Sequence, residues 1–362
     1  MEDSQNKLLD EPVPEIINSK GTYVPPSVDH SRLLAGESYS HYSPCPVNIT
    51  PSAKSSTEAE KAEPTPCVLG IDEAGRGPVL GPMVYSAFYL PIHLHNSLLA
   101  DEHHFDDSKV LTPEVRSNLM RSLCTQGHSL HNSCGWAVKV MSARDISSGM
   151  LRPSMAAVYN LNAQALDATI EIIRGVVETQ GIDVKEVYVD TIGKPETHQA
   201  RLLRVFPGLK ITVAKKADSL YPCVSAASVC AKVTRDAALE ACYESWVNQR
   251  KRKRSLESGG GEAVTAEEET LSWGSGYPSD GKCIGWLKKD MNPLFGWGIE
   301  CRFSWGTSKE LLEIKSGVKV DWPVEEDEST MLVTQYFTSK SEAEGLASEL
   351  RDWYGHKQAE IF

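Results

Sequence analysis

The chain has 362 residues, of which 41% are hydrophobic, which suits one large domain with tails or two average domains with an ordinary core. No stretch approaches the roughly 20 consecutive apolar residues of a membrane span, and the acidic start MEDSQNKLLDEP lacks an apolar signal core, so we expect a soluble, intracellular protein without a membrane partner. Nine cysteines are scattered without a C-x-x-C pair or a zinc spacing, which argues against a disulfide framework.

The formal net charge of -12 is concentrated at the two ends of the chain. Residues 1–66 have a net charge of -5 and residues 321–362 one of -7, so the middle is neutral. A neutral domain that gathers acidic side chains in one place must be basic elsewhere. The overall acidity therefore does not exclude a nucleic-acid backbone as a partner.

The first third of the chain predicts an unstructured extension followed by three strands. Residues 1–65 are rich in Ser, Pro, Glu and Thr with little periodicity, which predicts a disordered acidic N-terminal extension. From Cys67, the runs CVLGID and PMVYSAFYLP predict two strands joined by a glycine-rich turn. PEVRSNLMRSLC predicts a helix after Thr112-Pro113, and CGWAVKVMSA predicts a third strand. Three consecutive strands usually pair as an antiparallel meander.

The next part of the chain alternates helices with short strands. LNAQALDATIEIIRGVVETQG, within residues 153–181, predicts an amphipathic helix that ends at a glycine, and EVYVD predicts a buried strand. THQARLLRVF predicts a helix, LKITVAKKAD a strand, and VSAASVCAKVTRDAALEACYESWVNQR a helix whose small residues let it lie close to a sheet. This order predicts an α/β fold, a mixed sheet flanked by helices, with a catalytic domain at residues 66–250.

The end of the chain carries charged and aromatic segments. RKRKR with the following glycines and acids predicts an exposed charged insertion at residues 251–270, and RKRKR is either a nuclear localisation signal or the solvated end of a helix. Residues 271–320 predict a small C-terminal helical extension that completes the substrate site. Residues 321–362 predict an acidic tail whose apolar cluster MLVTQYF either binds a partner or folds back on the chain's own core.

Four acidic side chains are expected at the ends of three strands. Asp72 and Glu73 follow CVLGI, Asp190 ends VYVD, and Asp218 precedes a helix. Ligands bind at the carboxyl ends of strands in open α/β sheets, so these acids can surround one site. Asp72 and Glu73 would point to opposite faces of a regular strand, so both serve one site only if the strand ends or bulges there. A turn at Asp72 and helix N-caps at Asp190 and Asp218 are the structural alternatives.

Five blocks occur together and in one order: DEAGRGPVLGPMVY, the DSK of residues 107–109, YVDTIGKPETHQARL, KADSLYPCVSAASVCAKVTRD and GSGYPSD. Together they resemble the type 2 ribonuclease H family, specifically its eukaryotic catalytic subunit, over residues 66–310. The resemblance implies a ribonuclease H-like fold and a ribonuclease H that cuts the RNA strand of RNA-DNA hybrids and the 5′ side of ribonucleotides embedded in DNA. It places the family's metal-binding acids on Asp72, Glu73, Asp190 and Asp218, its Gly-Arg-Gly element on Gly75, Arg76 and Gly77, and its substrate-sensing tyrosine on Tyr277.

Physical chemistry agrees with these implied roles. Carboxylate oxygens suit Mg²⁺ or Mn²⁺, and two such ions roughly 4 Å apart can support in-line displacement at a phosphate. Glycine backbones can approach a single sugar hydroxyl while an aromatic ring packs beside them. Further candidates for phosphate or sugar contacts, each with a surface or capping role as the alternative, are Lys109, Asn160, Lys232 and Arg235. His198 could face the site one helix turn after Asp190, but a solvated helix histidine is the expected role.

The resemblance also implies partners and a cellular role. It implies a heterotrimer in which two accessory subunits dock on residues 295–340, and work in the nucleus on ribonucleotide excision repair and on primer removal during DNA replication. The residues themselves leave two other classes of protein open. A noncatalytic nucleic-acid-binding subunit would not need the intact acidic quartet, and a two-metal DNA nuclease of the same fold would not need the hydroxyl-sensing elements.

Overall fold

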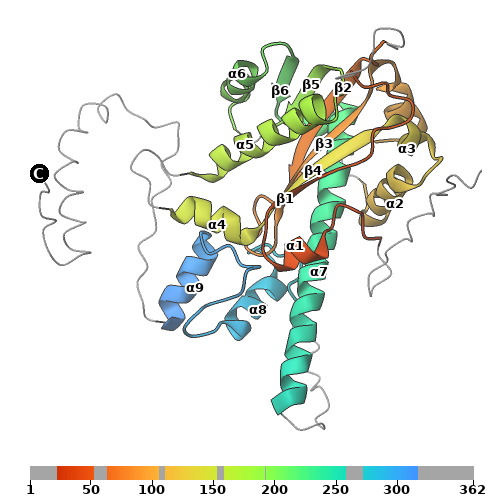
Figure 1. Cartoon of the computed structure of the whole chain (residues 1–362). Coiled ribbons are helices and arrows are strands. Elements are labelled where there is room, and N and C mark those ends of the chain that lie inside the picture. The colour runs from red at the N-terminus through yellow and green to blue at the C-terminus, as the bar shows by residue number, and fades with distance from the viewer. Residues whose placement is uncertain are drawn as a thin grey trace, which may run out of the picture. The chain divides into compact units, whose positions relative to one another are not determined.

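A computed structural model describes residues 23–52, 63–105, 111–152, 159–191, 193–257 and 272–316 (Figure 1). The predicted tail, most of the predicted insertion and the residues Asp107, Ser108 and Lys109 lie outside these ranges. The α-helices are α1 (His30–Leu34), α2 (Pro113–Cys124), α3 (Ser129–Ser133), α4 (Ala143–Leu151), α5 (Leu161–Arg174), α6 (Pro195–Val205), α7 (Pro222–Glu257), α8 (Gly281–Asp290) and α9 (Gly306–Ser316). The strands are β1 (Tyr39–Tyr42), β2 (Cys67–Ala74), β3 (Met83–Pro91), β4 (Gly135–Met141), β5 (Val184–Asp190) and β6 (Lys210–Ala214). Short 3-10 helices η1 (Ile92–Leu94) and η4 (Ala217–Ser219) and π-helical turns η2 (Ser97–Glu102) and η3 (Gly175–Thr179) complete the described part.

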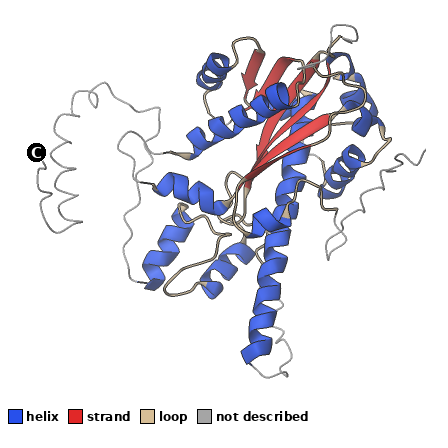
Figure 2. Cartoon of the chain, viewed as in Figure 1, coloured by secondary structure: helices blue, strands red, loops and turns tan. Residues whose placement is uncertain are grey.

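The six strands form one mixed sheet in the order β1-β4-β3-β2-β5-β6. Strands β2, β3 and β4 pair antiparallel as the predicted meander, and β1 pairs antiparallel with β4. Strands β2, β5 and β6 run parallel, and α6 is the crossover helix between β5 and β6. Figure 2 shows helices on both faces of this sheet. The predicted α/β class, a mixed ribonuclease H-like sheet flanked by helices, is therefore confirmed.

Each face of the sheet has its own apolar core. Helix α7 covers one face with small side chains such as Ala227 and Ala231, which are fully buried. A Cβ atom at Gly70 of β2 would lie 2.3 Å from the backbone of Cys223, so only glycine allows α7 to cross β2 this closely. On the other face, Ile172 and Ile173 of α5 belong to the core that contains the inner residues of β2. Strand β2 is thus held between two helices.

A third core joins the distal half of α7 to the C-terminal helices. Its centre is a group of indole rings, in which Trp273 and Trp286 are 5.2 Å apart and Trp246 of α7 lies 5.6 Å from Trp286. Leu239 of α7 and Leu287 of α8 are buried in the same cluster. The predicted small C-terminal helical extension is present as α8 and α9.

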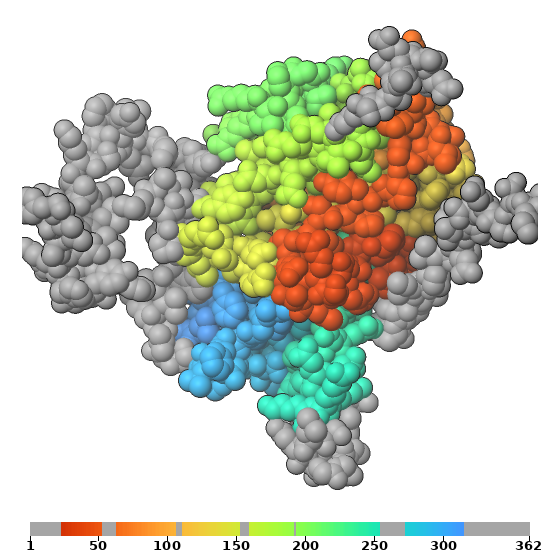
Figure 3. Space-filling model, in the orientation of Figure 1, coloured from red at the N-terminus to blue at the C-terminus, as the bar shows by residue number. Residues whose placement is uncertain are grey.

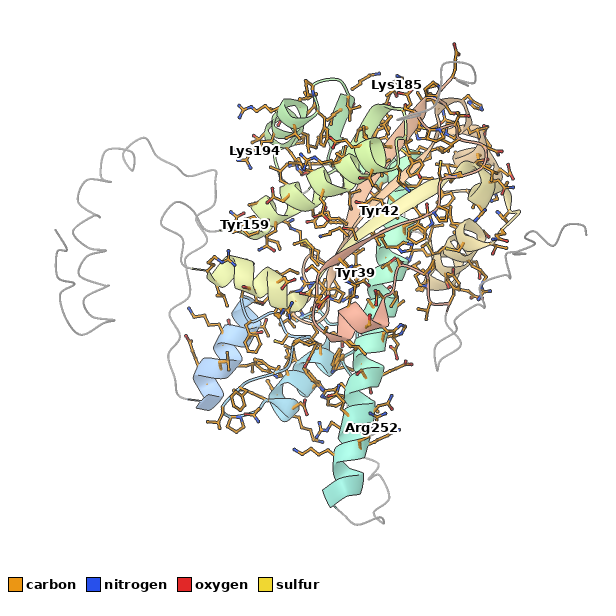
Figure 4. All side chains as sticks on the ribbon, in the orientation of Figure 1. Tyr39, Tyr42, Tyr159, Lys185, Lys194 and Arg252 are labelled. Carbon is orange, nitrogen blue, oxygen red and sulfur yellow. The ribbon has the colours of Figure 1, made fainter. Side chains whose placement is uncertain are left out.

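The described part of residues 1–65 contradicts the prediction of a disordered extension. Residues 23–52, red to orange in Figure 3, contain α1 and β1. Tyr39 of β1, which is labelled in Figure 4, is buried at 3% exposure. Its hydroxyl donates a hydrogen bond to the Ser27 carbonyl at 3.0 Å, and the Ser27 and Thr234 hydroxyls are 2.8 Å apart. Composition did not predict this folded segment because its apolar residues follow neither a helical nor a strand period. They are buried by packing on α7 and β4.

Two helices also differ from the sequence prediction. Helix α7 continues to Glu257, so RKRKR lies at the end of a helix, as one of its two alternatives had it, and the predicted start of the insertion at residue 251 is wrong. Helix α4 was not predicted, because CGWAVKVMSA reads as a strand to its end whereas Ser142 caps a helix by accepting a hydrogen bond from the Asp145 amide. None of the described helices is both long and apolar enough to cross a membrane.

Candidate active site

Asp72 and Glu73 lie where the β2–β5 ladder stops. Pairing between β2 and β5 ends at Ile71 and Val189, while pairing with β3 continues to Ala74 without a bulge at the acids. The two side chains therefore leave opposite faces of a strand that is open on its β5 side. The expected strand end or bulge at the acids is therefore absent: β2 continues to Ala74, and only its pairing with β5 stops before Asp72.

Asp72 is a buried carboxylate with few compensating donors. It is 6% exposed on the face covered by α7, where it is hydrogen bonded to Ser228, and its Oδ1 accepts the Glu73 amide at 2.7 Å. Burial, followed by repulsion from Glu73 and Asp190, raises the pKa of Asp72 well above its ordinary value. Burial and the neighbouring acids thus favour the protonated form of Asp72 when no cation is bound.

Glu73 points to the other face, beside an arginine of the following turn. Its Oε1 lies 3.8 Å from Nη1 of Arg76. Burial raises the pKa of Glu73 to about 7 despite the Arg76 charge, which lowers it, and Asp190 raises it further. The electrostatic coupling of both β2 acids to Asp190 indicates that the three carboxylates share one region.

Asp190 and Asp218 come together through a tight turn after β6. Asp190 ends β5 opposite Ala214, and its Oδ1 accepts the Ala217 amide at 2.7 Å. The left-handed backbone of Lys216, with φ of +58°, turns the chain into η4 and places Asp218 next to that amide at 5% exposure. The N-cap position of α6 is Lys194, whose side chain makes no capping hydrogen bond, so Asp190 is not the N-cap of that helix.

The donor set suits a hard divalent cation, although its atoms are not gathered around one point. Within the described ranges, no three His, Cys, Asp or Glu side chains form a ready metal-binding group. Asp72 and Asp190 each direct an oxygen to a backbone amide instead. Mutually repelling buried carboxylates are oxygen ligands of the kind that Mg²⁺ and Mn²⁺ prefer, and a cation would relieve their repulsion. Binding therefore requires side-chain rotation at the acids.

The Gly75-Arg76-Gly77 turn, Tyr277 and Arg235 meet next to these acids. A Cβ atom at Gly77 would lie 3.2 Å from Cε1 of Tyr277, and one at Gly75, where φ is +81°, would lie 3.1 Å from Cγ of Arg235. The Arg235 guanidinium lies 5.7 Å from the centre of the Tyr277 ring. Tyr277 is 39% exposed, so its ring is accessible to solvent. The backbone of Gly75 and Gly77 beside it carries no side chain.

Sequence reasoning missed two residues that hold this turn. Arg302 is fully buried and donates hydrogen bonds to the carbonyls of Gly75 at 2.7 Å, Arg76 at 3.1 Å and Gly81 at 3.0 Å. Trp305 donates from Nε1 to the Gly77 carbonyl at 3.0 Å. Burial lowers the pKa of Arg302 to about 9, so the guanidinium stays charged at neutral pH. The only signal in the sequence was an arginine among the aromatic residues of CRFSW.

A third missed residue, Asn162, contacts the arginine of the turn. Nη2 of Arg76 donates a hydrogen bond to Oδ1 of Asn162, at the start of α5. Arg76 therefore lies between a carboxylate of β2 and an amide of α5. Sequence reasoning had chosen its neighbour Asn160, which accepts the Ala163 amide at 2.9 Å as the N-cap of α5, the capping role given as the alternative.

The other predicted contacts have mixed outcomes. Arg235 is buried and donates to the Ser275 carbonyl at 2.6 Å, so it holds the Tyr277 segment. Lys232 is half-buried on α7, and Lys109 lies outside the described residues. His198 is half-buried, with Nδ1 3.4 Å from the Thr191 hydroxyl and a pKa lowered by burial, so the expectation of a solvated histidine was wrong.

A mixed sheet with a carboxylate cluster at the open end of β2, next to a glycine turn, defines a ribonuclease H-like enzyme.

Residues 69–265 match the family model described as Ribonuclease HII. The chain is 52% identical over 342 residues to the A subunit of Ribonuclease H2 from Neurospora crassa, covering 94% of this chain and 97% of that one. It is 40% identical over 278 residues to the A subunit of Ribonuclease H2 from Homo sapiens, covering 76% and 83%. The crystal structure of the ribonuclease H2 from Pyrococcus horikoshii OT3 has 25% identity and a TM-score of 0.49, covering 68% and 98%. The chain belongs to the ribonuclease HII family and is a ribonuclease H.

Proposed function

We propose that this chain is the catalytic subunit of a ribonuclease H2. It hydrolyses the RNA strand of RNA-DNA hybrids and cuts on the 5′ side of single ribonucleotides in duplex DNA. One observation carries the proposal: the acids and the hydroxyl-sensing elements meet at one place, where Arg76 of the glycine turn lies 3.8 Å from Glu73. A site that both holds a phosphate and reads a neighbouring sugar needs this juxtaposition.

The four acids would hold two divalent ions, Mg²⁺ or Mn²⁺. When bound, such ions supply an activated water and a positive charge that stabilises the phosphate in the transition state. Asp72 is oriented by Ser228 and the Glu73 amide, and Asp190 by the Ala217 amide. The acids would turn from these amide contacts toward the ions on binding, and no residue of the chain has to form a covalent bond to the substrate.

The glycine turn would recognise the ribose 2′-hydroxyl. Gly75 and Gly77 have no side chain, so the backbone can approach the sugar closely, and the exposed ring of Tyr277 can pack on it. Arg235 below the ring and Trp305 at the Gly77 carbonyl restrict the movement of both elements. This preorganisation favours a ribonucleotide over a deoxyribonucleotide. The cellular roles would be ribonucleotide excision repair and primer removal during DNA replication, in the nucleus.

Cleavage by neutral variants of the acids tests this proposal. Asp72→Asn and Asp190→Asn should each lower the cleavage rate by at least about a thousandfold, because an amide binds metal weakly at the same volume. The measurement is Mg²⁺-dependent cleavage of a duplex with one ribonucleotide, with exposed Asp101→Asn as control and a thermal melt to verify folding. Activity within about tenfold of wild type, an effect of only ~1.4 kcal/mol, would rule out an essential ligand.

The same assay separates the alternatives. Tyr277→Ala should impair cleavage at a lone ribonucleotide more than cleavage of continuous RNA, because a single 2′-hydroxyl offers fewer productive registers. An all-DNA duplex should resist cleavage, whereas a DNA nuclease of the same fold would cut it. A chain that binds hybrid without cutting any substrate would instead be a noncatalytic subunit.

We further propose that two accessory subunits dock on residues 295–340. In the described part of this segment Phe295 is 78% exposed and Ile314 is 79% exposed, and neighbouring Leu294 is 85% exposed. Exposed apolar side chains of this size are frequent at interfaces. A chain truncated before Asp321 should keep its fold and metal affinity yet co-purify less of the accessory proteins. Full recovery of a stoichiometric complex would restrict the interface to the residues before the truncation.

A further inference from the structure

His198 of α6 has a buried ring nitrogen that the proposed function does not use. The ring is held through its other nitrogen, because Nδ1 lies 3.4 Å from the hydroxyl of Thr191, the residue that follows Asp190. Nε2 is buried and forms no hydrogen bond with any residue that the structure describes. Burying a polar nitrogen without a partner costs free energy, so an unpartnered nitrogen this close to an active site points to a ligand that it binds.

The His198 ring and Glu73 lie on the same face of the sheet. Leu202, one turn after His198 on α6, is buried in the core that α5 forms with this face. Figure 1 shows α6 at one end of the described part and α8 towards the other, and Lys194, labelled in Figure 4, marks the start of α6. Tyr277 lies next to the start of α8, where its carbonyl accepts the Asp280 amide at 3.0 Å. The acids therefore lie between the ring of Tyr277 and that of His198.

Positive charge surrounds this part of the site. Arg76 is held on this face by Glu73, at 3.8 Å, and by the Asn162 side chain, and Arg201 follows His198 by three residues on α6. Burial, followed by the charges of Arg201 and Arg76, lowers the pKa of His198, so its ring is neutral at neutral pH. A neutral ring near two guanidinium groups suits an anion that accepts hydrogen bonds. In a nuclease, the backbone phosphates of the substrate are such anions.

We propose that His198 donates a hydrogen bond from Nε2 to the substrate phosphate one nucleotide 5′ of the phosphate that is cut. The proposal rests on the proposed function, in which the glycine turn and Tyr277 read the ribose on the 3′ side of the cut. His198 lies on the other side of the acids, so it meets the strand on the 5′ side.

The Thr191 hydroxyl supplies the tautomer that this contact needs. Its oxygen accepts the Gly193 amide at 3.2 Å, and its single proton is then donated to Nδ1 of His198. A neutral imidazole carries one proton, so the proton is on Nε2, which becomes a hydrogen-bond donor. Phosphate oxygens only accept, and they match this donor.

Two substitutions at this position separate the two ring nitrogens. In His198→Asn the short amide takes the place of Nδ1 beside Thr191, but no atom replaces Nε2. In His198→Gln the longer side chain carries its amide to the position of Nε2 and leaves Thr191 without its contact. Both variants lose the ring, so the loss of packing is matched. Affinity for a duplex with one ribonucleotide is measured without divalent ions, and kcat and KM are measured with Mg²⁺.

The Asn variant should bind about tenfold more weakly than wild type, because a hydrogen bond to a charged group is lost. Its KM should rise to the same extent while kcat stays within about twofold, because this phosphate is not the one that reacts. The Gln variant should stay within about threefold of wild type in both affinity and KM, since it keeps a donor for the phosphate. A thermal melt verifies that both variants fold.

A modified substrate identifies the phosphate. A methylphosphonate removes the charge of one chosen phosphate and weakens it as an acceptor. Placed one nucleotide 5′ of the cut, it should weaken binding by wild type and abolish the difference between wild type and His198→Asn. Placed one nucleotide 3′ of the cut, it should leave the tenfold difference in place.

Three results would overturn the proposal. Unchanged affinity of His198→Asn would show that Nε2 does not meet the substrate. A loss in His198→Gln as large as that in His198→Asn would assign the ring to packing and to holding Thr191. A difference between wild type and His198→Asn that persists with the 5′ methylphosphonate would exclude this phosphate. If the proposed function itself fails, wild type cuts no duplex with a ribonucleotide, so the two failures are distinguishable.

Discussion

Arg302 illustrates how one side chain can order a site that it does not enter. Its planar guanidinium presents several donors in a fixed geometry, and three of them meet carbonyls of the turn between Gly75 and Gly81. Trp305 stacks at 4.8 Å from the guanidinium and binds the Gly77 carbonyl. Burying a charge is costly unless its donors are satisfied, so this arrangement fixes the turn in one conformation.

Arg302→Lys tests this at the scale of one residue. Lysine keeps the charge but cannot reach three carbonyls in a plane, so we expect the free energy of unfolding to fall by about 2–4 kcal/mol, since a hydrogen bond to a charged group contributes about 1.5–3 kcal/mol. Cleavage at a single ribonucleotide should fall more than cleavage of continuous RNA, because the Gly75 and Gly77 backbones lose their fixed position. Urea denaturation and the two cleavage rates measure this.

Trp305→Phe is the matched control for Arg302→Lys. It removes one hydrogen bond, to Gly77, while keeping an aromatic ring beside the guanidinium. Its effects should be smaller in both measurements, near the roughly 0.5–1.5 kcal/mol typical of one neutral hydrogen bond. If Arg302→Lys were no more harmful than this variant, the three carbonyl contacts would not be what orders the turn.

At the scale of elements, α7 organises the whole site, and its start depends on a histidine. His95, after η1, accepts the Cys223 amide on Nε2 at 3.2 Å, which satisfies one of the open donors in the first turn. Burial lowers the pKa of His95, although Glu186 raises it. A protonated ring would present a donor to this amide, so the contact requires the neutral form.

This contact predicts a pH dependence of stability. In the unfolded chain His95 gains a proton as the pH falls through about 6.5, whereas the folded state resists protonation. Its contribution is therefore complete above about 6.5 and is lost as the pH falls toward the lower folded-state pKa. Between about pH 7.5 and 5.5, His95→Asn should lose less unfolding free energy than wild type in urea titrations, because asparagine accepts without titrating.

The exposed neighbour His93 supplies the control for this measurement. His93→Asn should follow the pH dependence of wild type, because the His93 side chain is exposed. Burial also lowers the pKa of His41 and His198, so part of the wild-type loss should persist in the His95 variant. An unchanged pH dependence in His95→Asn would show that the Cys223 contact does not couple folding to protonation.

At the scale of the whole molecule, the N-terminal segment completes the sheet. Strand β1 covers the edge of β4, with Tyr39 opposite Val140. Helix α1 packs into the apolar core between α7 and the sheet. Five buried apolar residues of this segment belong to that core: Tyr23, Val24, Val28, Leu33 and Tyr39. An edge strand without such a cover is open to pairing with another chain.

Two deletions measure what this segment contributes. Removing residues 1–62 should lower the free energy of unfolding by at least about 3 kcal/mol, because full burial of one such side chain is worth about 1.5–3 kcal/mol before the entropy of ordering the chain is subtracted. It should also promote aggregation, which light scattering detects. Removing residues 1–22 leaves these contacts in place and should change stability by no more than about 0.5 kcal/mol. Equal stability of the two would contradict the assignment.

The sequence by itself determined the features that local patterns encode. Alternation and helical spacing give strands β2 to β6 and helices α2, α5, α6 and α7, and the short strand before Asp190 places that acid at the end of its strand. Thr112 and Pro113 mark the start of α2, because a cap and a first-turn proline act within a few residues. These signals depend only on residues that are close together in the sequence.

Only the tertiary structure decided how distant segments meet. The Arg302 contacts join residues more than 220 positions apart, and Ser27 meets Thr234 across 207. No local window contains both partners of such a contact, so the fixed turn, the ordered N-terminal segment and the role of Arg235 beneath Tyr277 could not be predicted from the residues alone. The same holds for the end of α7, which stays helical because Trp246 and Arg250 are held by α8. Composition there left the end of the helix open, and packing against α8, which follows later in the chain, extends it.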